Sequence, residues 1–493
     1  MKRIFSNAVY PLAVGLCLRL LFVLKFPASS GDTILYEQIA ANWLKHHVYG
    51  MNVNGAIMPV DLRMPGYPAF LAVVYALTGR TRESARLWVM LAQIAGDLLG
   101  CLVIAKLARL LASSSEQDNS RGERVQSVAL WLAALCPFMA NYTAVPLTEV
   151  FASLWTGLAC CVFAVALLRV KRPEFLVRGS HMPLRRNAEY TALAAGVITG
   201  LGTLFRPEAP LLLAAAAVVF GVLFFSARAM LRWFWVSLAM VLGCLLVLSP
   251  WALRNIATLG ETQFLAPKYS NLPGELIPYG FMAWEKTWLF RVSDCYLVSW
   301  KLNEEAIDVD EIPARAFDSP AQKQRVAAIL DPYNEDLTLT KEEDDAFAQI
   351  ARERRERHPL RTHLWIPAAR AVTLWFSPRI ELLPISGHVF PLAYMREEDP
   401  VDQESTILLF LLNVFYVGLG AWGAARLWRS NASVRPLVGF LILFMLLRTA
   451  FLITLETPEP RYTLVCFPAL IAMGAQLFAG KRSDRERPEG LRI

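Results

Sequence analysis

The stretch RWFWVSLAMVLGCLLVLSPWAL at residues 232–253 decides the fold class, because after its first residue it carries no charge over a length that can cross a membrane. A helix needs about 20 mostly apolar residues to span the hydrocarbon core. Further apolar runs lie at about 8–26, 84–111, 125–142, 147–170, 189–205, 208–226, 406–426, 434–455 and 461–479. The sequence therefore predicts an all-α polytopic membrane protein with about ten transmembrane helices.

The composition agrees with this fold class, since 55% of the 493 residues are hydrophobic and only 18% are charged. The net charge of +7 comes from Lys and Arg in short connections that alternate along the chain. Short basic loops stay in the cytoplasm, so both termini are predicted to be cytoplasmic. The loop 27–83 and the long segment 255–405 then share the extracytoplasmic side. Because that long segment is rich in acids, we expect no nucleic-acid partner.

The order of the apolar runs predicts four parts. Residues 1–254 form an N-terminal transmembrane module that includes the first outer loop, 27–83. Residues 255–405 form an extracytoplasmic insert of mixed structure, in which 358–379 reads as an amphipathic helix on the membrane surface. Residues 406–479 form a C-terminal transmembrane module, and 480–493 form a cytoplasmic tail.

The polar residues at the predicted outer membrane boundary are the candidates for chemistry. An ionisable group at a membrane boundary is costly and is usually retained for a purpose. No HExxH zinc motif, phosphate-binding loop or GxSxG nucleophile elbow occurs in the sequence. What remains is a set of acids and arginines at the ends of the apolar runs, namely Asp32, Glu37, Asp61, Glu149, Arg206, Glu208, Arg254, Glu456, Glu459 and Arg461.

Six short segments resemble a known family. They are SGDTILYEQIAANWL, RMPGYPAFLAVVYALTG, PLTEVFASL, FRPEAPLLL, PWALRNIATLGE and PEPRYTLVCFPAL. In this order they are similar to the bacterial family-39 members of the GT-C glycosyltransferases, which are related to protein mannosyltransferases and to the lipid A aminoarabinose transferase. The resemblance covers residues 8–479 except the insert 265–357, which matches nothing recognisable. It implies a multi-pass protein of the bacterial cytoplasmic (inner) membrane.

The resemblance also implies an activity. Such enzymes move a sugar, a hexose or a pentose, from a polyprenyl-phosphate carrier to an acceptor on the extracytoplasmic side. The implied partners are this lipid-linked donor, membrane lipid and an acceptor that is a protein, a lipid or a polysaccharide. Asp32 corresponds to the family's first-loop acid, the general base or acceptor-orienting group, and Glu149 corresponds to the second-loop acid. Glu149 could hold a divalent cation or the acceptor, and no other cofactor is indicated.

The leaving phosphate gains negative charge, which a nearby cation stabilises. A guanidinium is suited to this because it can bind a phosphate through two parallel hydrogen bonds. Arg206, Arg254 and Arg461 are the candidates for this role, and the resemblance does not choose among them. The remaining candidates for substrate binding are Tyr36, Arg63, Tyr67, Glu459 and Tyr462.

Each assignment has a structural alternative. Asp32 could be a helix N-cap, and Glu149 could simply complement a helix dipole. The arginines could snorkel to the interface, and the tyrosines could belong to an interfacial aromatic belt. Asp97 lies deep in a span beside Gln93, so we expect it to join helices or to pair with Arg19.

Two other functions compete with sugar transfer. The first is a transporter or flippase that carries lipid-linked sugars without cleaving them. A transporter concentrates charge and broken helices near the bilayer midplane, whereas most candidate groups here lie at one face. The second is a scaffold that uses the insert for protein contacts.

Overall fold

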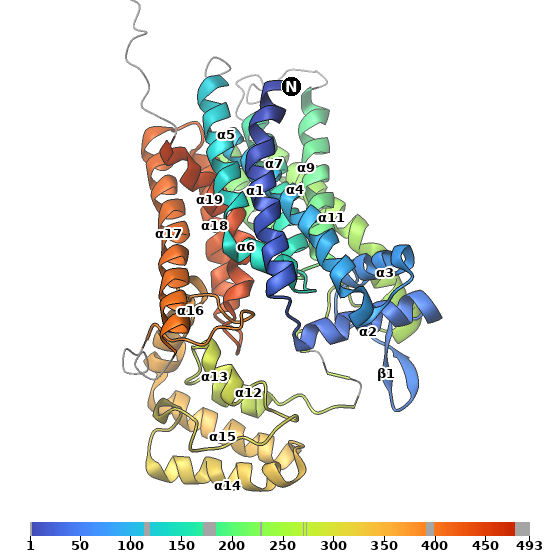
Figure 1. Ribbon diagram of the computed structural model, residues 1–493, viewed down its shortest axis with the longest axis vertical. Coiled ribbons are helices and arrows are strands. Elements are labelled where there is room, and N and C mark those ends of the chain that lie inside the picture. The colour runs from blue at the N-terminus through green and yellow to red at the C-terminus, as the bar shows by residue number, and fades with distance from the viewer. Residues whose placement is uncertain are drawn as a thin grey trace, which may run out of the picture.

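Figure 1 shows the computed structural model, which describes residues 2–112, 119–170, 184–226, 229–269, 271–272, 274–390 and 399–478. Long helices form a bundle, and a smaller helical body lies at one end of it. Within the described residues the only strands are β1 (Gly50–Val53) and β2 (Ala56–Pro59), an antiparallel pair. The predicted all-α polytopic membrane fold is confirmed.

Seven helical segments of the described chain are long and apolar enough to cross a membrane. They are α1 (Lys2–Lys25), α4 (Arg86–Ala112), α7 (Glu149–Val170), α11 (Met230–Leu259), α17 (Pro400–Ser430), α18 (Arg435–Leu452) and a last span, Pro460–Phe478, built from η6 (Pro460–Cys466), α19 (Phe467–Gly474) and η7 (Ala475–Phe478). An eighth span results if α5 (Asn119–Ala134) is combined with α6 (Pro137–Asn141) and η2 (Tyr142–Ala144), across a bend of 49°.

The prediction of about ten spans is therefore corrected to seven, or eight with the bent pair. The two runs that fall short, 189–205 and 208–226, do form helices, α9 (Leu184–Thr203) and α10 (Leu211–Ser226). The first opens with the polar sequence LRRNAE, and the second has only 16 residues. Both nevertheless pack into the bundle. A Cβ at Gly243 of α11 would lie 2.3 Å from the carbonyl oxygen of Leu193, so α9 and α11 approach at a distance that only glycine permits.

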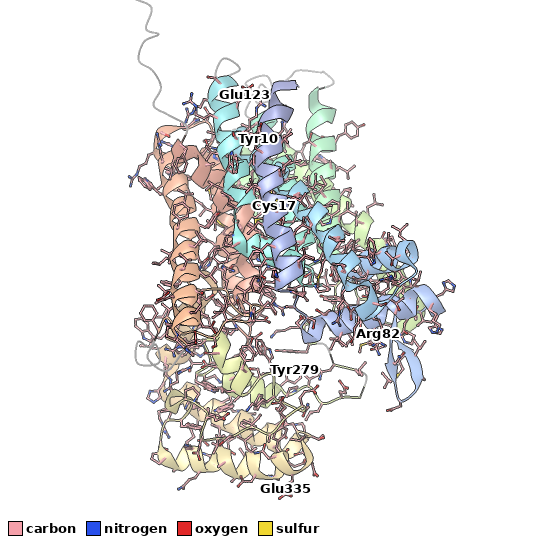
Figure 2. All side chains as sticks on the ribbon, in the orientation of Figure 1. Tyr10, Cys17, Arg82, Glu123, Tyr279 and Glu335 are labelled. Carbon is pink, nitrogen blue, oxygen red and sulfur yellow. The ribbon has the colours of Figure 1, made fainter. Side chains whose placement is uncertain are left out.

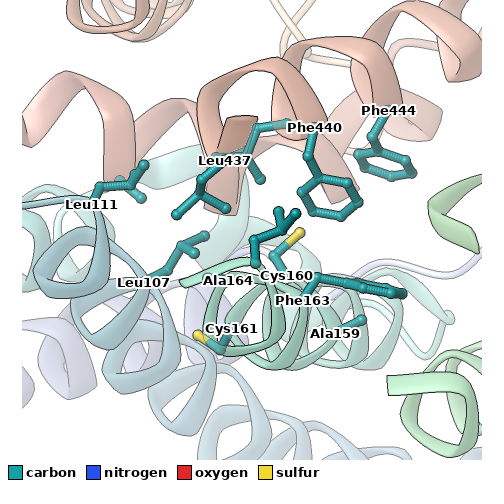
Figure 3. Close-up of a cluster of buried hydrophobic side chains, with 14 of the residues drawn as sticks. Leu107, Leu111, Ala159, Cys160, Cys161, Phe163, Ala164, Leu437, Phe440 and Phe444 are labelled. Atoms are coloured by element: carbon teal, nitrogen blue, oxygen red, sulfur yellow. The ribbon is translucent and has the colours of Figure 1, made fainter. Parts of the chain in front are cut away.

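The centre of the bundle is a cluster of interdigitating apolar side chains from α4, α7 and α18 (Figure 3). Leu107, Phe163 and Phe440 are fully buried in it, and the rings of the two phenylalanines lie 5.1 Å apart. Close packing of this kind resists displacement. It therefore fixes the position of α18, whose last residues form one wall of the cleft described below.

The first predicted outer loop folds onto the end of the bundle. It contains α2 (Gly31–His46), the β1–β2 hairpin, α3 (Gly66–Thr78) and η1 (Arg82–Ala85). The N–H of Gly66 donates to the carbonyl oxygen of Leu204 at 2.7 Å. A Cβ at Gly66 would lie 2.6 Å from that oxygen, so a glycine is required where the loop meets the end of α9. This contact places Arg63 close to Arg206.

The helical body at the bundle's end is the predicted insert. It contains α12 (Tyr279–Glu285), α13 (Val292–Leu297), η3 (Ala314–Ala316), α14 (Pro320–Asp336) and α15 (Lys341–Arg357). Its own core is built around the buried rings of Trp284, Trp288 and Phe347. The described part of 255–405 contains no strand, so the expected mixture of structure consists of helices joined by irregular loops.

The segment 358–379, predicted as an interfacial helix, does contain a helix, but that helix is shorter. It consists of the π-helical turn η4 (Arg361–Trp365), followed directly by α16 (Ile366–Trp375). The chain leaves the helix after Trp375 and reaches Arg379, whose φ of 59° is incompatible with a continuing helix. Leu360 and Trp365 are 69% and 65% exposed, as expected for residues that face lipid.

Candidate active site

Five segments meet at the end of the bundle that carries the insert. They are the start of α2, the loop before α3, the first residue of α7, the turn after α9 and the loop that leads into η6. Contacts and a shared cleft bring together eight of the ten predicted site residues: Asp32, Tyr36, Arg63, Glu149, Arg206, Glu459, Arg461 and Tyr462.

Asp32 lies in the first turn of α2 and joins two arginines. Its Oδ1 accepts a hydrogen bond from Arg63 Nη2 at 2.6 Å, and its Oδ2 accepts one from Arg461 Nη2 at 2.9 Å. The N-cap of α2 is Ser30, so the alternative that Asp32 caps this helix is wrong. The carboxylate instead contacts Arg461, which lies 429 positions further along the chain.

The protonation of Asp32 is set by two opposing effects. Burial alone would raise the pKa of this carboxyl, but the guanidiniums of Arg461 and Arg63 outweigh burial and hold the pKa well below its usual value. Asp32 is therefore ionised at neutral pH. While both arginines remain in contact, it is a weak proton acceptor.

Glu149 is the first residue of α7, and its side chain is almost completely buried. One carboxylate oxygen accepts a hydrogen bond from Arg206 and lies 3.9 Å from Arg461 Nε. The other oxygen, Oε2, has no hydrogen-bond partner within the protein. A buried acceptor without a donor is costly, and this one belongs to a carboxylate that lies next to Arg461, which also contacts Asp32.

Arg461 is the hub of the cluster. Besides Asp32 and Glu149, it contacts Glu459, with Nε 2.6 Å from Oε2. The hydroxyl of Tyr462 donates to Glu459 at 2.5 Å. The ring of Tyr462 lies 5.1 Å from the guanidinium of Arg206 and 5.2 Å from that of Arg461. These contacts hold the cations within one network.

A cleft of about 700 Å³ opens beside this network. Asp32, Arg63 and Arg206 line its polar end. Its apolar wall includes Leu211 at the start of α10 and Phe451 near the end of α18. This cleft has cations at one end and apolar side chains along its wall. It suits an amphiphile that has an anionic head and a hydrocarbon tail.

Two predicted site residues lie outside this network. Arg254 donates to the carbonyl oxygens of Tyr49 at 2.7 Å and Val60 at 2.8 Å, and so anchors the first outer loop. Tyr67 is fully buried, and its hydroxyl donates to Gln93 at 2.7 Å. These contacts are structural.

The predicted pairing of Asp97 with Arg19 is confirmed. Arg19 Nε donates to Asp97 at 2.6 Å. The same guanidinium also donates to the carbonyl oxygens of Gly15 and Ala134. This deep charge pair therefore joins α1, α4 and α5.

The structure adds residues that the predicted site did not include. Arg448 is buried in α18; it donates to Glu208 at 3.0 Å and to the carbonyl oxygen of Tyr462 at 2.8 Å. An arginine inside an apolar run was the available signal for it. Lys268 of the insert also lines the cleft, but nothing in its local sequence indicated this position.

The divalent cation considered at Glu149 is not matched by a set of ligands. The described residues contain no group of three or more His, Cys, Asp or Glu side chains that could hold a metal ion. The nearest charged partners of Glu149 are Arg206 and Arg461, which repel a cation.

Comparison with solved structures gives matches over nearly the whole chain. An oligosaccharyltransferase of Archaeoglobus fulgidus, solved with a tethered acceptor peptide, has a TM-score of 0.51 at 13% identity, covering 97% of this chain and 49% of that chain. ArnT from Cupriavidus metallidurans, bound to undecaprenyl phosphate, has a TM-score of 0.40 at 14% identity, covering 95% of this chain and 77% of that chain. No protein-family model and no curated protein sequence matches the chain.

Both structures are GT-C glycosyltransferases. The likeness to the archaeal enzyme shows that this chain shares the membrane fold of that enzyme. The chain spans about half the length of that enzyme. The comparison therefore concerns the fold.

Proposed function

We propose that this protein is a polyprenyl-phosphate-dependent glycosyltransferase of the family-39 type. It takes a hexose or pentose from a polyprenyl-phosphate carrier and transfers it to an acceptor on the extracytoplasmic side of the bacterial cytoplasmic membrane. The fold that it shares with membrane glycosyltransferases supports the reaction class. The acceptor is a protein, a lipid or a polysaccharide.

One observation carries the proposal: arginines and acids from five separate segments form one network, which lines the polar end of a cleft through Asp32, Arg63 and Arg206, and the other wall of that cleft is apolar. A polyprenyl phosphate fits this arrangement, since its phosphate can meet Arg63 and Arg206 while its chain runs along Leu211 and Phe451. The cleft lies beside α10 and the end of α18, so a lipid-borne donor can enter from the side.

The reaction forms a bond from the acceptor oxygen to the anomeric carbon of the sugar and breaks the bond from that carbon to the phosphate oxygen. The electron pair of the broken bond leaves with polyprenyl phosphate, and the acceptor's proton moves to a carboxylate. Guanidiniums stabilise the charge that grows on the leaving phosphate. Without a donor, Asp32 is neutralised by Arg63, which also lines the cleft, and by Arg461, which lies behind the lining.

The donor phosphate competes with Asp32 for these two arginines. As they turn to the phosphate, Asp32 loses the contacts that lower its pKa and becomes a better proton acceptor. Donor binding thus prepares the base. Glu149 is buried behind the cleft and contacts Arg206 and Arg461, so it positions these two cations for the leaving phosphate.

The pH dependence should reveal this coupling. In Arg63→Met one of the two cations is lost while the burial of Asp32 remains, so the pKa of Asp32 rises. Protonation then removes the base at a higher pH, and the acidic limb of the pH–rate profile should move upward relative to wild type. Arg86→Met is the matched control, because Arg86 pairs with Glu37 instead. An unshifted limb in Arg63→Met would contradict the assignment of Asp32.

The proposed orientation places both termini in the cytoplasm and the insert outside. Glu335 of the insert and Glu123 at the start of α5 lie at opposite ends of the molecule (Figure 2). In a chain whose exposed Cys17 is replaced by alanine, a membrane-impermeant thiol reagent applied to intact cells should label Glu335→Cys and spare Glu123→Cys. The reverse pattern would overturn the orientation.

Comparative mass spectrometry tests the function in cells. Outer lipids, envelope polysaccharide and exported proteins from cells with the wild-type gene should contain a sugar that is missing when the gene carries Asp32→Asn. An Arg86→Met gene should retain the product. Identical profiles from wild-type and Asp32→Asn cells would count against sugar transfer.

A further inference from the structure

A second cavity of about 450 Å³ lies at the junction of the insert and the end of α18. It shares no lining residue with the cleft described above. Three cationic side chains, Lys286, Arg355 and Arg370, line it together with one carboxylate, Glu456. Figure 2 labels Tyr279, another lining residue, between the bundle and the body of the insert.

Arg370 of α16 is the fixed cation of this cavity. The residue is only 2% exposed. Its Nε donates to the carbonyl oxygen of Leu289 at 2.8 Å, and its Nη1 donates to that of Ile453 at 3.3 Å. Its Nη2 has no hydrogen-bond partner. Burial lowers the pKa of Arg370 to about 10, so the group stays charged at neutral pH. A buried charged group with an unused donor indicates an absent acceptor.

Lys286 supplies a second, adjustable cation. Its Nζ lies 2.6 Å from Glu456, which also lies 3.7 Å from Lys268 and accepts a hydrogen bond from Tyr269 at 3.0 Å. Glu456 is thus shared between lysines of the two cavities. Glu456 keeps its contacts with Lys268 and Tyr269 when Lys286 turns away. Lys286 can therefore turn toward an incoming anion without leaving Glu456 unpaired.

The cavity lies beside surface suited to lipid contact. The turn η4, which contributes Thr362 and His363 to the lining, also carries Leu364 and Trp365, 55% and 65% exposed. Apolar side chains beside basic ones are typical of segments that lie at the level of lipid headgroups. An anion at this level is most directly a phosphate of a membrane lipid.

We propose that this cavity is a second anion site that binds a phosphate group, with Arg370 and Lys286 as its donors and a lipid headgroup or a free phosphate ion as the source. It is separate from the donor cleft and goes beyond the proposed transfer reaction. A guanidinium and an ammonium converging on one phosphate give charge-assisted hydrogen bonds from both sides.

Calorimetric titration of the purified full chain in a neutral detergent tests the site, with short-chain phosphatidic acid and inorganic phosphate as separate probes. Lys286→Gln and Arg370→Gln should each weaken binding by about tenfold or more. Glu456→Gln should tighten binding by about two- to fivefold, because Lys286 loses a competing carboxylate. Lys286 is partly exposed, so its variant remains informative if Arg370→Gln fails to fold.

Two controls make the result specific. Lys323→Gln removes an exposed lysine of the insert that pairs with Asp310. This variant should bind the two probes as tightly as wild type does. Arg461→Gln should leave this site intact, which separates it from the donor cleft and from the outcome of any sugar-transfer assay. Binding of phosphatidic acid alone assigns a lipid headgroup, and equal binding of inorganic phosphate assigns the free ion. No binding, or binding unchanged in Lys286→Gln, would overturn the proposal.

Discussion

Sugar transfer by the Asp32→Asn protein should be about 100- to 10,000-fold slower than by wild type, the range expected for the loss of a general base. Asparagine keeps the shape of the side chain but cannot take the acceptor's proton. It also leaves Arg63 and Arg461 without the carboxylate that both contact. The initial rate of transfer from a polyprenyl-phosphate sugar, normalised to folded protein, is the measurement that checks this.

Glu37→Gln is the matched control for Asp32→Asn. Glu37 lies on the same helix and accepts two hydrogen bonds from Arg86, at 2.7 and 2.9 Å, but it does not line the cleft. Its loss should lower stability while leaving the rate per folded molecule near wild type. If Asp32→Asn stays active while Glu149→Gln is inactive, the two acids have exchanged roles. If both variants stay active, the site lies elsewhere.

Arg461→Gln should lower kcat/KM by about two orders of magnitude or more. Each hydrogen bond to a charged group is worth about 1.5 to 3 kcal/mol, and about 1.4 kcal/mol is a tenfold change. Arg461 contacts three carboxylates, those of Asp32, Glu149 and Glu459. Its loss removes charge from the leaving phosphate and leaves these acids facing one another. Steady-state kinetics with the lipid-linked donor measure the effect.

Arg254→Gln separates the two kinds of arginine at this end of the bundle. Arg254 donates to backbone carbonyl oxygens of the first outer loop and lies outside the network around Arg461. We expect lower thermal stability and a rate within about tenfold of wild type, because the hydrogen bonds of Arg254 hold the first outer loop and do not reach the donor phosphate. A larger loss of kcat/KM in Arg254→Gln than in Arg461→Gln would reverse the assignment.

The sequence predicted the membrane class because most of its apolar runs are long enough to cross a membrane as helices, which satisfy their own backbone hydrogen bonds. It overestimated the number of spans, since the helix of the run 189–205 has a polar start and that of the run 208–226 has only 16 residues. The run 125–142 breaks by 49° between α5 and α6. The end of the helix at Trp375 was also missed, although Pro378, three residues later, is a local signal that a helix stops.

The candidate site was predicted in part. Acids and arginines at span ends were visible as costly groups, but their partners depend on how distant segments pack. Arg63 meets Asp32 because Gly66 lets the first loop dock on α9. Arg254 has the same local signal as Arg461, yet it contacts only one other segment. Sequence spacing cannot distinguish these two outcomes.

Transfer by the purified protein from a lipid-linked donor tests the central claim most directly. The protein is reconstituted in vesicles with a synthetic polyprenyl-phosphate sugar labelled in the sugar and with a membrane extract from cells that lack the gene. We expect label in a new product, with equimolar release of polyprenyl phosphate, and no transfer from the matching nucleotide sugar. Transfer from the nucleotide sugar in lipid-free detergent, or movement of the uncleaved lipid-linked sugar to the opposite leaflet, would contradict the account.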